Sequence, residues 1–267
     1  MLKSLFSGQL QLGLAQAAVA ALAALGVVLL AQRRGIHLVN ELVIAMIRGL
    51  VQIIAVGSIL LLLLRGPSWT SIFLLMAMMV AAGATSAKRA KGMPQAFQVS
   101  TWAIACGAGS VIAAMTLLGV IDTPITALVP VGSMLIANAM NTNGLALNRF
   151  RADVLAHVGE IEAALALGAD GKTSVAPYVQ GSFEASLIPA IDSLRSLGIV
   201  WIPGLMAGML LSGARPVYAA IYQFVVLAII FAASGLTSLM STLLMRTRVM
   251  SPADQLILRP GQQTAGS

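Results

Sequence analysis

Long apolar runs, separated by short charged stretches, dominate the pattern of this chain. Cutting the sequence at its charged residues leaves seven windows, each long enough for a helix of about 20 residues to cross a bilayer. A transmembrane β-barrel would instead show segments of roughly 10 residues with alternating polarity. The pattern therefore predicts an all-α membrane protein with seven spans, near residues 8–31, 42–64, 67–87, 98–120, 124–147, 196–213 and 217–245.

The composition agrees with this pattern. Apolar residues make up 58% of the 267 residues and charged residues only 9%, whereas soluble domains carry about 25% charged residues. The bilayer core holds no water, so every backbone N–H and C=O must be satisfied within the chain, as it is in helices. We expect residues 1–267 to form a single transmembrane domain.

The first apolar run could also be read as a signal peptide, because Lys3 precedes it and small residues lie near Ala15 and Ala21. The uncharged run continues to Gln32, which is too long for the apolar part of a signal peptide, so we interpret it as a retained helix. Cys106 is the single cysteine and lies in a predicted span. A disulfide or a cysteine-based metal site within one chain is therefore excluded.

Basic residues predict the orientation, because cytoplasmic loops are enriched in Lys and Arg. Twelve basic residues follow the first, third, fifth and seventh spans, three lie on the other side, and Arg48 lies within a span. This places the N-terminus outside and the C-terminus in the cytoplasm. Topology thus accounts for the net charge of +7. Without aromatic residues interleaved in a basic patch, that charge does not indicate nucleic-acid binding.

The segment 149–195 carries ten of the 25 charged residues and is predicted to be the one sizeable cytoplasmic element. Apolar residues recur in it at helical spacing, which predicts an amphipathic helix over roughly 152–168. We expect this helix to end at Gly168 and Asp170-Gly171 to form a turn. The apolar face of the helix consists of Val154, Val158, Ile161 and Leu165.

Gly171-Lys172-Thr173 resembles the end of a phosphate-binding P-loop. A P-loop needs a further glycine five residues earlier and a strand leading into it, but residue 166 is Ala and no strand is predicted. The chain therefore has no recognisable nucleotide site, and any ATP would be bound by another polypeptide. The sequence also lacks a Ser-His-Asp set, paired intramembrane carboxylates and an HExxH motif, so an enzyme is not expected.

Within the predicted amphipathic helix, Glu162-Ala163-Ala164 is followed after three residues by Gly168. This resembles the EAA-x3-G loop of ABC importer permeases, whose short helix docks on the ATPase subunit. Small side chains let another protein surface approach closely, and a carboxylate can meet a basic partner. Ala-rich amphipathic helices are common, so this motif alone does not identify an importer.

Two stretches resemble a known family over nearly the whole chain. Pro130 to Asn141 (PVGSMLIANAMN) is similar to the P-x-G-M-x-x-(G)-N-x-M-N signature of the FetB-like permeases. Ile202 to Gln223 resembles the PGMMTG…G-x-x-P…A-x-x-YQ block of the same family. The run from Glu160 to Ala169 also fits, as does Arg48 with Gln52.

The FetB-like family comprises bacterial iron-export permeases and plant aluminium-tolerance permeases. The resemblance implies a permease of the bacterial inner membrane that exports metal ions such as iron. It also implies two permease chains with two separate cytoplasmic ATPase subunits, which would bind ATP and Mg²⁺. Some plant relatives point instead to nucleotide sugars, and an ATP-independent channel or carrier is the alternative from another class. The residues expected to couple to the ATPase are Glu160, Glu162, Ala163, Ala164 and Gly168.

Polar residues inside predicted spans are candidates for the transport pathway. Arg48 and Gln52 are four residues apart and share a helix face. Arg48 either lines the pathway or extends to the cytoplasmic interface. Asn138, Asn141 and Asn143 either bind an ion or a polar solute or hold neighbouring helices together.

The sixth predicted span supplies the remaining candidates. Pro203-Gly204 is predicted to break or kink this span, either as a moving element that exposes backbone to substrate or as a passive bend. Met206 is one of fourteen methionines. These either form a path for a soft metal or fill gaps in an apolar core, so the metal ligands are left unassigned.

Overall fold

A computed structural model gives the arrangement of the chain and describes residues 9–32, 39–63, 69–90, 92–251, 253 and 255–258. The secondary structure of this part is helical, with only isolated backbone bridges besides the helices. The chain divides into two compact units, Met1–Gly66 and Pro67–Ser267, which are described separately.

The first unit consists of α2 (Gln9–Gln32) and α3 (Val39–Leu63), which pack against each other. Their bounds agree with the helices predicted over 8–31 and 42–64. None of the side chains described in either helix is buried. α2 carries no charged residue and α3 carries only Glu41 and Arg48. Exposed surfaces that are so largely apolar need lipid or protein around them, so these two helices have the surface of membrane spans.

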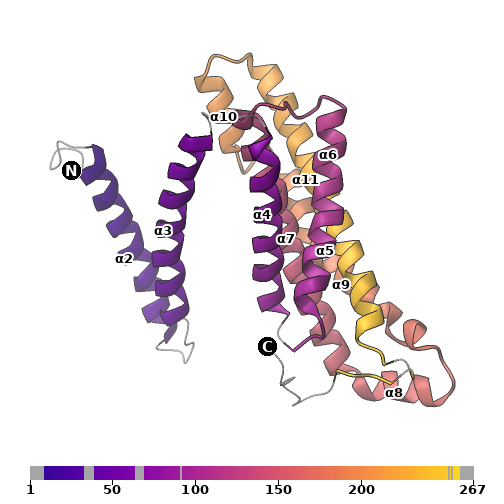
Figure 1. Ribbon diagram of the computed structural model, residues 1–267. Coiled ribbons are helices and arrows are strands. Elements are labelled where there is room, and N and C mark those ends of the chain that lie inside the picture. The colour runs from indigo at the N-terminus through magenta and orange to yellow at the C-terminus, as the bar shows by residue number, and fades with distance from the viewer. Residues whose placement is uncertain are drawn as a thin grey trace. The chain divides into compact units, whose positions relative to one another are not determined.

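The second unit is a bundle of long helices with short elements at its two ends, and Figure 1 shows α8 at one end and α10 at the other. In the described part of the whole chain, six helices are long and apolar enough to cross a membrane, and four of them belong to this unit. The elements are α4 (Thr70–Arg89), α5 (Ala96–Ile104), the π-helix η1 (Ala105–Gly109), α6 (Ser110–Leu117), α7 (Ile125–Ala156), α8 (Val158–Ala166), α9 (Gly171–Ser196), α10 (Gly204–Leu211) and α11 (Pro216–Arg248).

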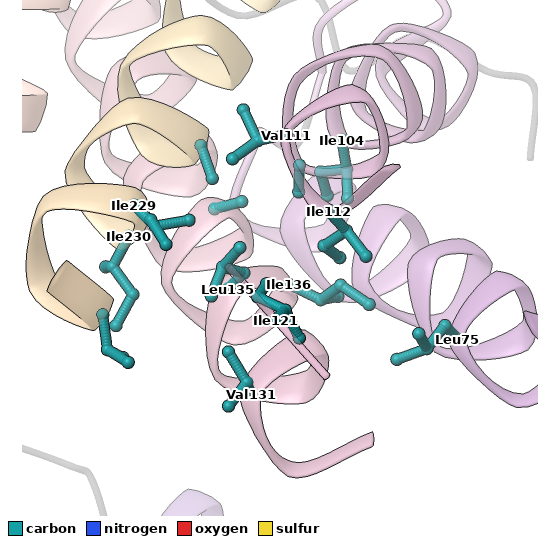
Figure 2. Packing of buried hydrophobic residues seen from close by; sticks show 14 of the residues in the cluster. Leu75, Ile104, Val111, Ile112, Ile121, Val131, Leu135, Ile136, Ile229 and Ile230 are labelled. Carbon is teal, nitrogen blue, oxygen red and sulfur yellow. The ribbon is translucent and has the colours of Figure 1, made fainter. Parts of the chain in front are cut away.

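One apolar core joins the long helices toward the α10 end. Figure 2 shows Leu135 and Ile136 of α7 among branched side chains from α4, α5, α6 and α11. A second core lies toward the α8 end and includes Phe150 and Ile161, both at most 1% exposed. The second core fixes α8 against the bundle.

The π-helix η1 lets the α5–η1–α6 span approach α11 closely. A β-carbon at Gly107 would collide with the backbone and hydroxyl of Thr237 on α11. A single π-turn inside an α-helix shifts the side chains that follow it. Gly107 therefore permits a helix crossing that any larger residue would push apart.

The predicted sixth span, 196–213, is wrong as a continuous helix. Only α10, eight residues long, is helical there, and it begins directly after Pro203. Gly198 and Gly213 have φ values of 76° and 88°, which end the regular structure on each side. The apolar run is too short between these breaks to cross a bilayer.

The segment predicted as a cytoplasmic excursion instead contains α9, a 26-residue helix that packs along both α7 and α11. The sequence prediction missed it because Lys172, Glu184, Asp192 and Arg195 divide its apolar residues. These four side chains are exposed, while Ser182 and Ser186 lie buried against the bundle. The charges therefore lie on faces of α9 away from its neighbours in this unit.

The predicted amphipathic helix 152–168 is divided in two. α7 continues to Ala156, and α8 begins at Val158 after a bend at His157. The predicted apolar face is confirmed, because Val154 and Ile161 are buried and Val158 and Leu165 pack against them. Gly168, with φ of 91°, ends the helix as predicted.

The end of α8 has the hydrogen bonds of a Schellman motif. The Gly168 N–H donates to the carbonyl of Leu165, and the Ala169 N–H donates to that of Ala164, both at 3.0 Å. Asp170 does not form a separate turn but precedes the first residue of α9. The chain thus reverses from α8 directly into the bundle.

Candidate functional site

A cavity of about 370 Å³ opens between α7, α9 and α11 in the second unit. Its wall mixes amide, hydroxyl, thioether and apolar groups. Two larger cavities of about 540 and 610 Å³ are almost wholly apolar, and another of about 470 Å³ is lined in part by the basic residues Lys172, Arg246 and Arg248. The lining consists of Met134, Asn138, Asn141, Thr142, Leu145, Pro189, Ala190, Ser193, Trp201, Leu227 and Ile230.

α7 supplies the polar wall of this cavity. Asn138 and Asn141 are three residues apart, so they share one helix face with Met134 and Leu145, and both amides are exposed. Asn138 Nδ2 donates to the carbonyl of Met134 at 2.8 Å. This bond orients the amide so that its carbonyl oxygen can accept a hydrogen bond or a cation from the cavity.

α9 supplies the opposite wall, and Pro189 shapes it. Proline has no N–H, so the carbonyl of Ala185 has no intrahelical donor at this turn. Ser193 Oγ donates to the carbonyl of Pro189 at 2.8 Å. The turn before Pro189 therefore lacks one helix hydrogen bond, as does the turn before Pro177, and of these two prolines Pro189 is the one that lines the cavity.

Asn143 has a different role from its two neighbours. It is fully buried, and its Nδ2 donates to Ser86 Oγ of α4 at 2.7 Å. Interhelical bonds of this kind hold membrane helices together. Of the three asparagines in this part of the sequence, one joins helices and two face the cavity.

The other candidates for the pathway do not line this cavity. Arg48 and Gln52 are exposed on α3, in the first unit. Pro203 is buried and precedes α10, where it starts the helix rather than kinking a longer one. Gly204 is exposed and Met206 is half-buried, also in α10. The structure therefore brings together only Asn138 and Asn141 from the predicted set.

The predicted coupling residues lie on α8 and at its end. Glu160, Glu162, Ala163 and Gly168 are exposed, and Ala164 is half-buried. Contacts with Tyr178 of α9 hold the start of α8 in place. Tyr178 of α9 stacks on His157 with ring centroids 5.1 Å apart, and its hydroxyl donates to Glu160 Oε2 at 3.3 Å.

Sequence reasoning missed several residues of both sites. Leu167 projects from the end of α8 and is 89% exposed, which is high for a large apolar side chain. Pro189 and Ser193 are four residues apart and face the cavity. Their spacing was visible in the sequence, but the charged residues around them led to a cytoplasmic assignment. Trp201 reaches the cavity from outside any long helix, and no local pattern indicated it.

The two sites are connected by the chain itself. α8 lies between α7 and α9 in sequence, and those two helices form opposite walls of the cavity. Ile161 anchors α8 in the core shared by α7 and α9. A displacement of α8 would therefore move both walls. In the described part of the chain, no group of three His, Cys, Asp or Glu residues could hold a metal ion.

Comparisons with known proteins give a family and several relatives. The model of an uncharacterised protein family, UPF0014, matches residues 14–250. The chain is 32% identical to the UPF0014 membrane protein STAR2 of Oryza sativa subsp. japonica over 226 residues, 84% of this chain and 79% of that protein. It is 29% identical to Protein ALUMINUM SENSITIVE 3 of Arabidopsis thaliana over 245 residues, 91% and 90% of the two chains.

A bacterial relative has a more explicit name. The chain is 29% identical to the "Probable iron export permease protein FetB" of Escherichia coli (strain K12) over 233 residues, 86% of this chain and 90% of that protein. No solved structure matches the chain. The relatives are covered over most of their length, so the similarity extends across the bundle and both sites.

Proposed function

The chain belongs to the UPF0014 family of multi-pass membrane proteins, and we propose that it is the permease subunit of an ABC transporter that exports metal ions such as iron. A separate cytoplasmic ATPase would bind ATP and Mg²⁺ and supply the energy. The permease would act as a homodimer in the cell inner membrane. The name of the E. coli relative supports the transport class.

The observation that carries this proposal is the position of α8. It stands at the end of the bundle, with Glu162, Ala163 and Leu167 exposed, and it connects the two walls of the cavity. An exposed apolar tip beside small residues fits a groove on a partner protein. ATP-driven movement of such a partner would reach the cavity through α7 and α9.

The proposal includes seven crossings with the sixth reassigned to α9. α9 runs beside two candidate spans and, at about 1.5 Å per residue, is long enough to cross. Placing α9 in the membrane keeps the N-terminus outside and α8 in the cytoplasm. The charges on α9 then lie on one face of a span rather than in a loop.

The basic residues of the bundle support this orientation. Seven of those described in the second unit lie near the helix ends on the α8 side of the bundle, and two lie near the opposite ends. This distribution fits the enrichment of Lys and Arg on the cytoplasmic side. The first group is Lys88, Arg89, Arg149, Arg151, Lys172, Arg246 and Arg248, and the second is Arg195 and Arg215.

The cavity would hold the transported solute. Amide oxygens and hydroxyls are hard ligands of the kind that hard metal ions prefer, while Met134 offers the only thioether among its lining residues. The same groups could bind the hydroxyls of a sugar. Both classes of solute, a metal ion and a nucleotide sugar, are therefore tested as substrates.

The test is ATP-dependent transport in proteoliposomes that contain this chain and its ATPase. Fe²⁺ kept reduced with ascorbate and a radiolabelled nucleotide sugar are the two solutes. Glu162→Lys should lower the permease-stimulated ATPase rate by about tenfold, a typical size for coupling between sites. The thermal stability of the permease should not change, because Glu162 is exposed.

Asp192→Lys is the matched control, since it reverses an exposed acidic residue at the other end of α9. It should leave the stimulated ATPase rate unchanged. Unaltered stimulation in Glu162→Lys would contradict docking at α8. Transport by the permease alone, without ATP, would contradict the ABC assignment.

A further inference from the structure

Glu184 occupies an unusual place for an acidic residue. It is thirteen residues from Gly171 and twelve from Ser196, or about 20 and 18 Å from the ends of α9. Among the acidic residues in the described part of the chain, it alone lies more than three turns from both ends of its helix. Sequence reasoning found no intramembrane carboxylate because it placed this segment in the cytoplasm.

Glu184 and Gln180 form an oxygen-rich pair on the exposed side of α9. Gln180 Nε2 donates to Glu184 Oε1 at 2.9 Å, and both side chains are exposed. This bond uses one carboxylate oxygen and the amide nitrogen. Glu184 Oε2 and Gln180 Oε1 are left as possible ligand atoms, and oxygen is the ligand that hard cations prefer.

The exposed side of α9 differs from the rest of the bundle surface. Phe73 of α4, Trp102 of α5 and Phe224 of α11 are 57–66% exposed and suit a lipid surface. An ionisable side chain at this depth instead faces protein or a water-filled cavity. The backbone is also open to close approach here, because nothing lies within 4 Å of a β-carbon built at Gly181.

We propose that the outer face of α9, formed by Pro177, Gln180, Gly181, Glu184 and Ile188, meets the same face of a second copy of this chain and lines a cation pathway between them. Glu184 is the cation ligand of this pathway. The inference rests on the proposed function, which supplies the transport that the pathway serves. It differs from the cavity described above, which lies on the opposite side of α9.

A second copy would complete the site that the pair of side chains on one α9 leaves incomplete. A divalent metal ion takes about six oxygen ligands, whereas the pair on one α9 provides two free oxygens. Two copies related by a two-fold axis would provide two carboxylates and two amide oxygens, with water completing the shell. The two carboxylates repel each other when the site is empty, so this interface itself favours a cation.

Disulfide trapping tests the interface in native membranes. Cys106 is the only cysteine, so Cys106→Ser gives a clean background. Gly181→Cys in that background should form a covalent dimer on mild oxidation. Ser186→Cys, on the buried face of α9 and 2% exposed, should form none. If Gly181→Cys gives no dimer, or if Ser186→Cys gives as much dimer as Gly181→Cys, the interface is overturned.

Cation flux tests the role of Glu184 in the proteoliposomes described above. Glu184→Gln should lower ATP-dependent Fe²⁺ flux by about tenfold or more, and Glu184→Asp should restore part of it. Asp192→Asn, two turns further along the helix, should leave flux unchanged. If Glu184→Gln leaves the flux unchanged and the wild type still transports, the role of Glu184 is overturned and the permease assignment stands. Loss of ATP dependence in the wild type would instead overturn the proposed function itself.

Discussion

α9 and α11 are neighbours in one bundle, but only one of them looks like a membrane helix in sequence. α11 is 33 residues long and qualifies as a candidate span by its apolar content. α9 is 26 residues long, carries four charged residues and does not qualify. Both bury small polar side chains where they meet, since Ser186 and Ser238 share a hydrogen bond of 2.7 Å.

The difference between these helices lies on their outer faces. α11 presents apolar side chains such as Phe224 outward, whereas α9 presents Gln180 and Glu184. A charged side chain at the centre of a lipid-facing helix costs about 2.5–3.5 kcal/mol on insertion scales. A helix with a charged side chain at its centre avoids this cost only if its polar face meets protein or water. Hydropathy therefore identifies the helices that face lipid and misses crossing helices that carry a polar face.

The comparison of α9 with α11 as two membrane helices fails entirely if α9 does not cross the membrane. In a Cys106→Ser background, Arg195→Cys should react with an impermeant maleimide added to intact cells. Lys172→Cys should react only after permeabilisation, because the two positions are at opposite ends of α9. Labelling of both positions only after permeabilisation would return α9 to the cytoplasm.

A large energetic effect is expected where α11 packs against η1. Gly107→Val should destabilise the bundle by about 3 kcal/mol, because the added side chain collides with the backbone of Thr237. Unfolding in mixed micelles by a denaturing detergent measures this free energy.

Gly109→Val is the control in the same π-turn. Its β-carbon would meet only the flexible end of Met79, at 3.4 Å, so the cost should stay below about 1 kcal/mol. Equal losses from the two variants would show that the close approach to α11 does not matter.

The smallest effect concerns the contact between α9 and α11 themselves. A double-mutant cycle on Ser186→Ala and Ser238→Ala should give a coupling free energy of about 0.6 kcal/mol, the average for interhelical hydrogen bonds in membranes. Ser182 bonds only the carbonyl of Val179 in its own helix. A cycle on Ser182 and Ser238 should therefore show no coupling, and equal values in both cycles would contradict a direct bond.

Most of the long helices could be predicted from the sequence, and α8 could be predicted in part. The apolar face of α8 and its end at Gly168 follow from local spacing, and both are confirmed. The bend at His157 was not predictable, because the apolar spacing continues through it without a break. Of the residues that line the cavity, the sequence prediction named only Asn138 and Asn141 on α7. It named none on the opposite wall, because that wall comes from α9, which was not predicted as a span.

The sequence by itself determined that this is a helical membrane protein, where six of its long helices lie, and to which family it belongs. An uninterrupted apolar run is a local property, and six such runs correspond to long helices in the structure. The run at 196–213 does not, because its helix is interrupted at Gly198, Pro203 and Gly213. Only the tertiary structure placed α9 beside α7 and α11 and separated its buried serines from Glu184. That arrangement depends on which face of a helix meets which neighbour, and composition averaged along a helix carries no information about faces.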